Sequence, residues 1–262
     1  MKFLVVGDVV GRSGMNILKN NIKKIKDEEK IDVIIINGEN ATGGRGIKEK
    51  ELYELYDMGA DCVTMGNHIY YRKEARELYI NEKKLIIPAN VTNLDGHGSM
   101  VINKNGVKIG VINLLGKVHL NEINGDFVRD PFEVAKEEVE KLKEENVDYI
   151  FVDFHAEATA EKIALSYYLE KDCTCVYGTH THVPTADERV YESGLAYITD
   201  IGMTGPVESV LGLKKEIAVA RFVTGEKLKY ECSENRGMLN AIIVETDNST
   251  KRAVSIKRYC IN

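Results

Sequence analysis

Short runs of β-branched and aliphatic residues alternate with longer amphipathic stretches in the first ninety residues, and this alternation most restricts how the chain can fold. Phe3–Val6, Val33–Ile36 and Cys62–Met65 are apolar at nearly every position, which is typical of strands buried on both faces of a sheet. The segments between and after them that have the spacing of helices are 16–28, 48–58 and 72–78. Strands interleaved with helices in this way predict an α/β fold with a largely parallel sheet.

After residue 88 the sequence also predicts antiparallel strands. Asn105-Gly106 lies between two alternating runs in 100–109, which is a strong signal for a hairpin. The other strands that we expect in this half are 149–154, 174–177, 196–199, 217–223, 239–244 and 253–258. The helices that we expect are 130–144, with Pro131 in its first turn, and 160–169. This order predicts two stacked mixed β-sheets flanked by helices, a four-layer α/β/β/α sandwich, in a single domain spanning residues 1–262.

Composition restricts the partners of the chain. The formal net charge is -6, so no basic surface argues for duplex DNA or for an anionic membrane. The chain enters a strand at Lys2 without an apolar stretch long enough for a signal peptide or a membrane span, and we therefore expect a cytoplasmic protein. The 5 cysteines are odd in number and scattered through apolar runs, which indicates reduced thiols rather than a disulfide framework. Cys173 and Cys175 have the spacing of a metal pair, but residues 174–177 alternate as a strand does, so we expect both thiols in the core.

Polar residues able to bind a metal ion follow five of the apolar runs. In chain order they are Asp8, Glu39 and Asn40, Asn67 and His68, His155, and finally His180 and His182. Because the strands of an α/β sheet present their carboxyl ends to ligands, we expect these side chains to converge. Two histidines one residue apart at a strand end can both turn into one small volume. The pattern therefore predicts a two-metal hydrolytic site of the kind that acts on phosphate esters.

Each of these residues has a simpler explanation when it is taken alone. Asp8 is typical of a helix cap, Asn40 of a turn, and His155 of a buried core histidine. A lone His-x-His is more often part of a loop than a pair of ligands. The joint pattern favours the metal site, because chance rarely provides a suitable ligand at every strand end in succession. The remaining histidines, His97 and His119, are expected to have surface or local structural roles.

The glycine-containing segment Gly7–Ser13 is a second candidate for phosphate binding. It lacks the Gly-Lys-Ser/Thr ending of a nucleoside triphosphate loop and the spacing of a dinucleotide fingerprint. We therefore reject both motifs, and expect its glycines to let the backbone pass close to a metal-bound phosphate.

The motifs together resemble those of the calcineurin-like metallophosphoesterases, whose blocks are Asp-x-His, Gly-Asp-x-x-Asp, Gly-Asn-His, a lone His and Gly-His-x-His. Gly66-Asn67-His68 matches the third block, and Gly178-Thr179-His180-Thr181-His182 is close to the fifth. Two blocks depart from the pattern: Asp8 lacks the histidine that usually follows, and Gly38-Glu39-Asn40 replaces the second aspartate block. These paired departures resemble the bacterial YmdB-like phosphodiesterases, and the resemblance extends over the whole chain, including 202–206.

This resemblance implies a dinuclear metal centre. One metal ion would take Asp8, Glu39, Asn40 and His182, and the other would take Glu39, Asn67, His155 and His180. Glu39 would bridge the two ions, and Asn40 would replace the missing histidine. Such mixed nitrogen and oxygen ligands suit iron or manganese, with zinc as the alternative, better than magnesium. His68 is implied to be a catalytic residue, not a ligand, that protonates the leaving oxygen or stabilises developing charge.

The implied activity is hydrolysis of 2′,3′-cyclic nucleotides or related small phosphodiesters, by in-line attack of a hydroxide that bridges the metals. Arg45 and the loop at Thr204 are candidate phosphate or base contacts, although solvated loop positions explain them equally well. Two alternatives remain open. One is a nucleotide phosphomonoesterase with the same metal centre. The other is a regulatory nucleotide- or RNA-binding protein that uses the site to capture phosphate. Self-association into a homo-oligomer also stays open, since metallophosphoesterases often form oligomers.

Overall fold

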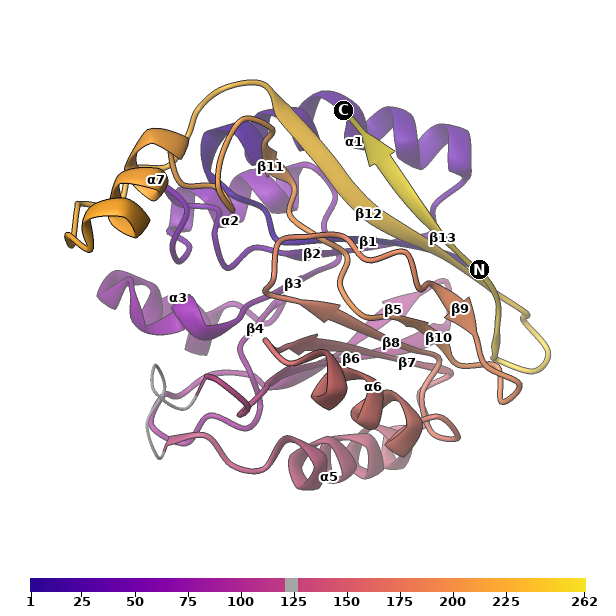
Figure 1. Ribbon diagram of the computed structural model, residues 1–262. Helices are drawn as coiled ribbons and strands as arrows, with labels where there is room; N and C mark the ends of the chain where they lie inside the picture. Colours follow the sequence, from indigo (N-terminus) through magenta and orange to yellow (C-terminus); the bar gives the residue numbers. More distant parts are fainter. Residues whose placement is uncertain (121–126) are drawn as a thin grey trace.

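Two β-sheets packed face to face form the centre of the computed structural model, which describes residues 1–120 and 127–262 (Figure 1). The strands of the first sheet are β1 (Lys2–Val6), β2 (Val33–Asn37), β3 (Cys62–Thr64), β4 (Leu85–Ile86), β11 (Gly205–Pro206), β12 (Gly237–Thr246) and β13 (Ala253–Ile261). Their order is β11-β12-β1-β2-β3-β4, with β13 paired to β12. Strands β1 to β4 are parallel, whereas β12 runs antiparallel to β1, so that Phe3 lies opposite Val244.

The second sheet is also mixed. Its strands are β5 (Ser99–Lys104), β6 (Val107–Leu115), β7 (Tyr149–His155), β8 (Cys175–Thr179), β9 (Arg189–Val190) and β10 (Ala196–Ile198). Their order is β5-β6-β7-β8-β10-β9, with parallel pairing from β6 to β10 and antiparallel pairing at both edges. The predicted hairpin joins β5 to β6, and its Asn105 and Gly106 have φ of 53° and 83°, as a tight left-handed turn requires.

Helices cover the outer face of each sheet, which gives the four layers expected from the sequence (Figure 1). Those on the first sheet are α1 (Gly11–Glu29), α2 (Glu49–Asp57) and α3 (Arg76–Asn81), with the short turns η1 (Asn67–Tyr70) and η2 (Lys73–Ala75) before α3. Those on the second sheet are α5 (Pro131–Glu144) and α6 (Thr159–Tyr168). In the described residues, no helix is both long enough and apolar enough to cross a membrane.

The alternation of side chains along a strand explains how each sheet is buried on both faces. On β1, Leu4 and Val6 pack toward the helices, while Phe3 and Val5 pack toward the second sheet. The ring centroid of Phe3 lies 4.4 Å from that of Phe151 on β7. Burial of one such ring contributes about 1.5–3 kcal/mol. This contact packs the two sheets against each other in the layer between them, away from the carboxyl ends of the strands.

Residues 217–223, which the sequence predicted as a strand, form the helix α7 (Lys215–Thr224), so this prediction was wrong. A short, continuous apolar run does not distinguish a strand from a helix by its period. Gly225 ends the helix in the left-handed conformation, with φ of 72°, as is common after a helix. The helix buries Ala218 but leaves Phe222 88% exposed, and it projects from the edge of the molecule in Figure 1.

The prediction for the paired cysteines was confirmed. Both side chains are buried, and all five cysteines of the chain are free. Cys173 packs in the apolar layer between the second sheet and its helices, whereas Cys175 packs in the layer between the two sheets. The two thiols therefore belong to different layers of the core and do not form a metal pair.

Candidate metal centre

The strand ends of the two sheets bring the predicted site residues into one cluster. From the first sheet, Asp8 follows β1, Glu39 and Asn40 follow β2, and Asn67 and His68 begin η1 after β3. From the second sheet, His155 is the last residue of β7, and His180 and His182 follow β8. The cluster thus lies where both sheets end, with side chains from each.

Three acidic and imidazole groups form the middle of this cluster. One ligand atom each from Asp8, Glu39 and His155 lies within 4.8 Å of the others, and all three residues are buried. Glu39 Oε2 is 3.3 Å from His155 Nε2. Asp8 Oδ1 is buried and has no hydrogen-bond partner within residues 1–120 and 127–262. A buried carboxylate oxygen without a partner carries a desolvation penalty that a bound cation removes.

Each histidine ligand predicted from the sequence turns one ring nitrogen into the cluster. His155 Nε2 lies 3.0 Å from Asn67 Oδ1 and 3.1 Å from His180 Nδ1. His182 Nε2 lies 3.1 Å from Asn40 Nδ2. These inward nitrogens and the Asn67 oxygen are the donor types of a mixed nitrogen and oxygen metal site.

The outward nitrogen of each ring is held from outside the cluster. The partners are Thr179 Oγ1 at 2.9 Å from His155 Nδ1, the Leu211 carbonyl at 3.1 Å from His182 Nδ1, and the Glu157 carboxylate at 3.1 Å from His180 Nε2. Such partners orient an imidazole and fix which nitrogen is free to bind metal. The rings are therefore positioned by the protein itself.

Asn40 is the residue whose present orientation fits a ligand role least well. Its Nδ2 faces Glu39 Oε1 at 2.9 Å as well as His182, and its Oδ1 lies 2.7 Å from His68 Nδ1. An amide binds metal through its oxygen. Asn40 would therefore have to turn its amide by half a rotation to serve as a ligand, whereas Asn67 already presents its oxygen.

Burial and mutual contact shift the pKa values of the carboxylates and imidazoles of the cluster. Burial raises the pKa of Asp8 to about 8, against the opposing effect of His155. Burial lowers the pKa of His155, but the carboxylates of Glu39, Asp8 and Asp153 together more than offset this and raise it to about 9. Burial and the nearby His155 lower the pKa of His180 to about 3. A bound dication stabilises the ionised carboxylates and neutral imidazoles together, so the residues fit a metal site.

Gly66 is required by close packing inside the cluster. A Cβ at this position would lie 2.2 Å from Glu39 Oε2 and 2.4 Å from His155 Nε2. Gly7 is also required by packing, since a Cβ there would lie 1.9 Å from the Gly202 carbonyl oxygen. Packing against Gly202 therefore explains why residue 7 is glycine, and the expectation that the glycines of Gly7–Ser13 let the backbone pass close to a metal-bound phosphate stays a prediction.

The sequence model of a family described as YmdB-like protein matches residues 4–259. The chain belongs to the YmdB-like protein family. A 2′,3′-cyclic-nucleotide 2′-phosphodiesterase of Bacillus subtilis (strain 168) is 41% identical to it over 263 aligned residues, which cover 100% of this chain and 97% of the relative. A putative phosphatase/phosphodiesterase of Mycoplasma pneumoniae is 39% identical, over 97% of this chain and 90% of the relative. These relatives carry the names of phosphoester hydrolases, the enzyme class that the sequence predicted.

Solved structures of similar proteins agree with this YmdB-like assignment. A novel phosphatase of Mycoplasma pneumoniae has a TM-score of 0.92 and 38% identity, covering 100% of this chain and 93% of the other. A hypothetical protein of Thermus thermophilus has a TM-score of 0.91 and 32% identity, covering 100% and 99% of the two chains. A 5′-nucleotidase precursor of the same organism, at a TM-score of 0.63 and 13% identity, shares the fold, with 54% of its length covered.

The turn that carries His180 and His182 in this YmdB-like chain is strained. Their φ angles are 98° and 66°, in a region that costs a non-glycine residue about 1–3 kcal/mol. The His180 N–H donates to Asp8 Oδ2 at 3.3 Å, and the Thr181 N–H donates to Asp200 Oδ2 at 3.1 Å. These bonds hold both imidazoles toward the cluster against the strain.

The sequence did not identify the buried ion pair and hydrogen bonds that hold the strand ends and loops of the cluster in place. Asp200 is paired with Lys162 Nζ at 2.7 Å, and both side chains are buried. Asp153 is buried and accepts from Asn37 Nδ2 at 3.0 Å and from Thr179 Oγ1 at 2.7 Å. Asp153 precedes His155 by two residues on β7, so the period of the strand could have identified it. No local sequence pattern links Lys162 to Asp200, because Lys162 lies on α6 and Asp200 lies in the loop after β10.

The two positions considered as substrate contacts have different surroundings. Thr204 is fully buried, and its hydroxyl bonds to the main chain of Asn240 at 3.0 Å, so its side chain does not face a substrate. Arg45, in contrast, lines a hollow together with His68. The substrate contacts expected of Arg45 and of the loop at Thr204 stay predictions, and in that loop the buried Thr204 hydroxyl is not available for such a contact.

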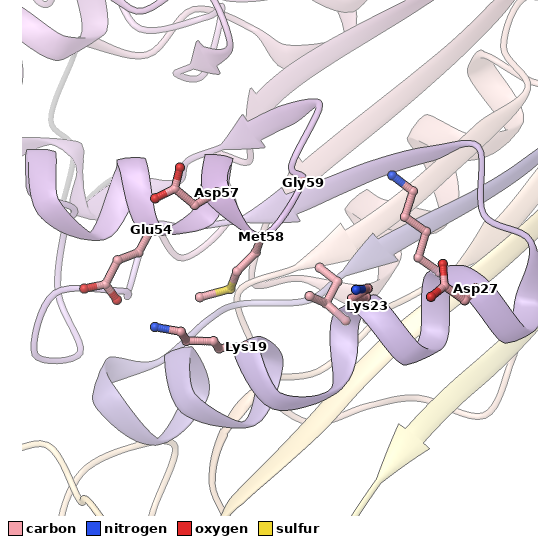
Figure 2. Close-up of a pocket in the computed structure, with 9 residues that line it drawn as sticks. Lys19, Lys23, Asp27, Glu54, Asp57, Met58 and Gly59 are labelled. Atoms are coloured by element: carbon pink, nitrogen blue, oxygen red, sulfur yellow. The ribbon is translucent and has the colours of Figure 1, made fainter.

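A separate hollow of about 480 Å³ lies between α1 and α2 (Figure 2). Figure 2 shows Lys19, Lys23 and Asp27 from the first helix, with Glu54 and Asp57 from the second. None of the residues that line this hollow belongs to the cluster at the strand ends. The charges of both signs that surround it are those of an ordinary solvated groove.

Proposed function

We propose that this chain is a dinuclear metal phosphodiesterase that hydrolyses 2′,3′-cyclic nucleotides or related small phosphodiesters. The observation that carries the proposal is the Asp8 carboxylate, which is buried beside Glu39 and His155 with one oxygen unpartnered among the described residues. The name of the Bacillus subtilis relative, at 41% identity over the whole chain, supports the substrate class.

The proposed ligands fall into two overlapping sets. The first metal ion would be held by Asp8, Glu39, Asn40 and His182, and the second by Glu39, Asn67, His155 and His180. Bound metal ions supply positive charge that neutralises the phosphate and acidifies a water molecule. The mixed donor set favours iron or manganese, with zinc as the third choice.

His68 is the proposed proton donor to the leaving oxygen. Its side chain is 27% exposed, and its Nδ1 lies 3.0 Å from Glu39 Oε1 and 2.7 Å from Asn40 Oδ1. Nδ1 thus faces the buried Glu39 carboxylate. Nε2, the other ring nitrogen, is the atom proposed to donate a proton to the leaving ester oxygen.

Metal analysis of Glu39→Gln tests the ligand assignment. Wild-type protein reconstituted with manganese or iron should contain two ions per chain and hydrolyse adenosine 2′,3′-cyclic phosphate. The variant should lose bound metal and activity, because a neutral amide replaces a buried anionic donor. Glu192→Gln, at an exposed position, is the matched control and should retain both. Full metal content in Glu39→Gln would contradict the bridging role.

Kinetics of His68→Ala test the catalytic assignment. The variant should retain both metal ions while kcat falls by about 10²–10⁴-fold, the usual effect of losing a general acid. His97→Ala is the control, because the His97 ring bonds to the Ile80 carbonyl at 3.1 Å and has no proposed role. Unchanged turnover in His68→Ala would contradict the proposed role of His68 as the proton donor.

The second candidate function is hydrolysis of nucleotide monoesters at the same centre. It is favoured by the Mycoplasma pneumoniae phosphatase, which is 38% identical to this chain. Comparing kcat/KM for adenosine 2′,3′-cyclic phosphate with that for adenosine 3′-phosphate separates the two. Preference for the cyclic diester supports the proposal, and preference for the monoester replaces it. Metal-loaded protein that hydrolyses neither ester would favour a phosphate-binding role.

A further inference from the structure

A hollow of about 350 Å³ lies beside His68, at the edge of the candidate metal centre. Its lining residues are Arg45, Asn67, His68, Tyr70 and Tyr71. This volume is within the range of about 300–1,000 Å³ found for small-molecule sites. Whatever occupies it lies next to the residue proposed to protonate the leaving oxygen.

Two of the lining residues, Arg45 and Tyr71, belong to a stack that also contains Tyr230 and Arg72 behind the lining. The Arg45 guanidinium carbon lies 4.3 Å from the ring centroid of Tyr230 and 5.4 Å from that of Tyr71. The Arg72 guanidinium lies 5.4 Å from the Tyr71 centroid, and its Nε donates to the Arg45 carbonyl at 3.1 Å. These contacts place the Tyr71 ring beside the Arg45 loop and stabilise that arrangement, since each cation–π contact is attractive.

Two side chains able to bind a ligand, Arg45 and Tyr71, line the hollow. Tyr71 is 51% exposed, and its ring centroid lies 6.3 Å from that of His68. Within the described ranges of the chain, the Arg45 guanidinium forms no ion pair with a carboxylate. An aromatic surface and a row of N–H donors therefore lie together beside His68. A nucleobase, which has a flat ring and acceptor atoms along its edge, matches both.

We propose that Tyr71 and Arg45 form the nucleobase subsite of this chain, a proposal that rests on the proposed phosphodiesterase function. The base stacks on the Tyr71 ring, and Arg45 donates hydrogen bonds to acceptors on the base edge. A 2′,3′-cyclic nucleotide has a single phosphate, which belongs at the metal centre. Arg45 is therefore left to bind the nucleoside part of the substrate.

Stacking on Tyr71 predicts a specific kinetic signature. Loss of the stack weakens the ground state and the transition state equally, so KM rises while kcat is unchanged. Tyr71→Leu should raise KM for adenosine 2′,3′-cyclic phosphate by about 5- to 150-fold, the effect of one base–aromatic stack. KM for glycerol 1,2-cyclic phosphate, which has the same five-membered cyclic diester but no base, should not change. Tyr71→Phe keeps the ring and should behave as wild type.

Tyr168→Leu is the matched control, because Tyr168 on α6 is also 51% exposed and does not line the hollow. Arg45→Met should raise KM for the nucleotide alone. An equal rise in KM for both cyclic diesters in Tyr71→Leu, or no rise for either, would overturn the subsite while leaving the proposed function intact. Failure of the metal-loaded wild-type protein to hydrolyse either diester would overturn the proposed function and the subsite with it.

Discussion

The buried ion pair of Lys162 and Asp200 supports a quantitative stability prediction. Lys162 Nζ lies 2.7 Å from Asp200 Oδ2, and the side chains are 1% and 0% exposed. Asp200 also accepts the main-chain N–H of Thr181 at 3.1 Å and of Gly202 at 2.8 Å. Lys162→Met keeps an unbranched side chain of similar length beside Gly178 but removes the charge. Asp200 then remains buried without its cation.

The expected loss follows from the protonation of Asp200. In the wild-type protein, burial tends to raise the pKa of Asp200, but Lys162 and the surrounding N–H groups lower it overall. Without Lys162, breaking such a pair costs about 3–5 kcal/mol. The cost is limited because the carboxyl can take up a proton instead. Holding an aspartic acid neutral at pH 7 costs about 4 kcal/mol, given an ordinary pKa near 3.9 and about 1.4 kcal/mol per pH unit. We therefore expect a loss of about 3–4 kcal/mol at pH 7.

Urea unfolding of the metal-loaded wild-type and Lys162→Met proteins measures this loss. If Asp200 is protonated in the folded variant but ionised when unfolded, the folded state binds more protons, so stability increases as pH falls. The deficit relative to wild type should shrink by up to about 1.4 kcal/mol per unit between pH 7 and pH 5. The double variant Lys162→Met/Asp200→Asn should recover most of the loss and show no such trend. A loss below about 1 kcal/mol, or one that is independent of pH, would refute the reasoning.

Two further variants test packing at the cluster and charge at the surface. Gly66→Ala should lose metal while keeping its far-UV circular dichroism, because its Cβ would lie 2.2 Å from Glu39 Oε2; bound metal at wild-type level would contradict this. The pKa of Asp172 is lowered, because bonds from Lys143 at 2.7 Å and Lys136 at 3.0 Å outweigh its burial. Asp172→Asn should therefore cost about 1 kcal/mol or less at pH 7, where the exposed lysines are screened. That deficit should shrink as pH falls through the lowered pKa of Asp172, and a deficit that is as large in acid as at pH 7 in urea unfolding would argue against the ion pairs.

The arrangement of the site was predictable because it depends on local pattern. Asp8, Glu39, Asn67 and His155 each follow an apolar run, and parallel strands place such positions at one edge of a sheet. The structure brings these side chains together, and their metal-binding roles stay predictions. The two mixed sheets and their outer helices were predictable for the same reason, since both depend on the periods of apolar residues.

The unpredictable parts depend on contacts between segments that are distant in sequence. The Lys162–Asp200 pair joins α6 to the loop after β10, and no local pattern marks either residue. Tyr230 lies about 185 residues after Arg45 in the sequence. Neither segment alone therefore predicts that the Arg45 guanidinium packs on the Tyr230 ring. The helix at 215–224 was missed because it is peripheral. Ala218 is its one buried apolar residue, so the pattern of its apolar residues carries little information on which face is buried.

The pairing of β1 with β12 has a consequence for the order of events during synthesis. Phe3 leaves the ribosome well before its partner Val244, which lies about 240 residues later in the sequence. At about 5–20 residues per second, β1 waits roughly 10–50 s for the strand that lies beside it. All of the proposed ligands, from Asp8 to His182, emerge within that interval, before the first sheet can close. The nascent chain is therefore exposed to free metal ions and to chaperones with its ligands present but its β1 edge unpaired.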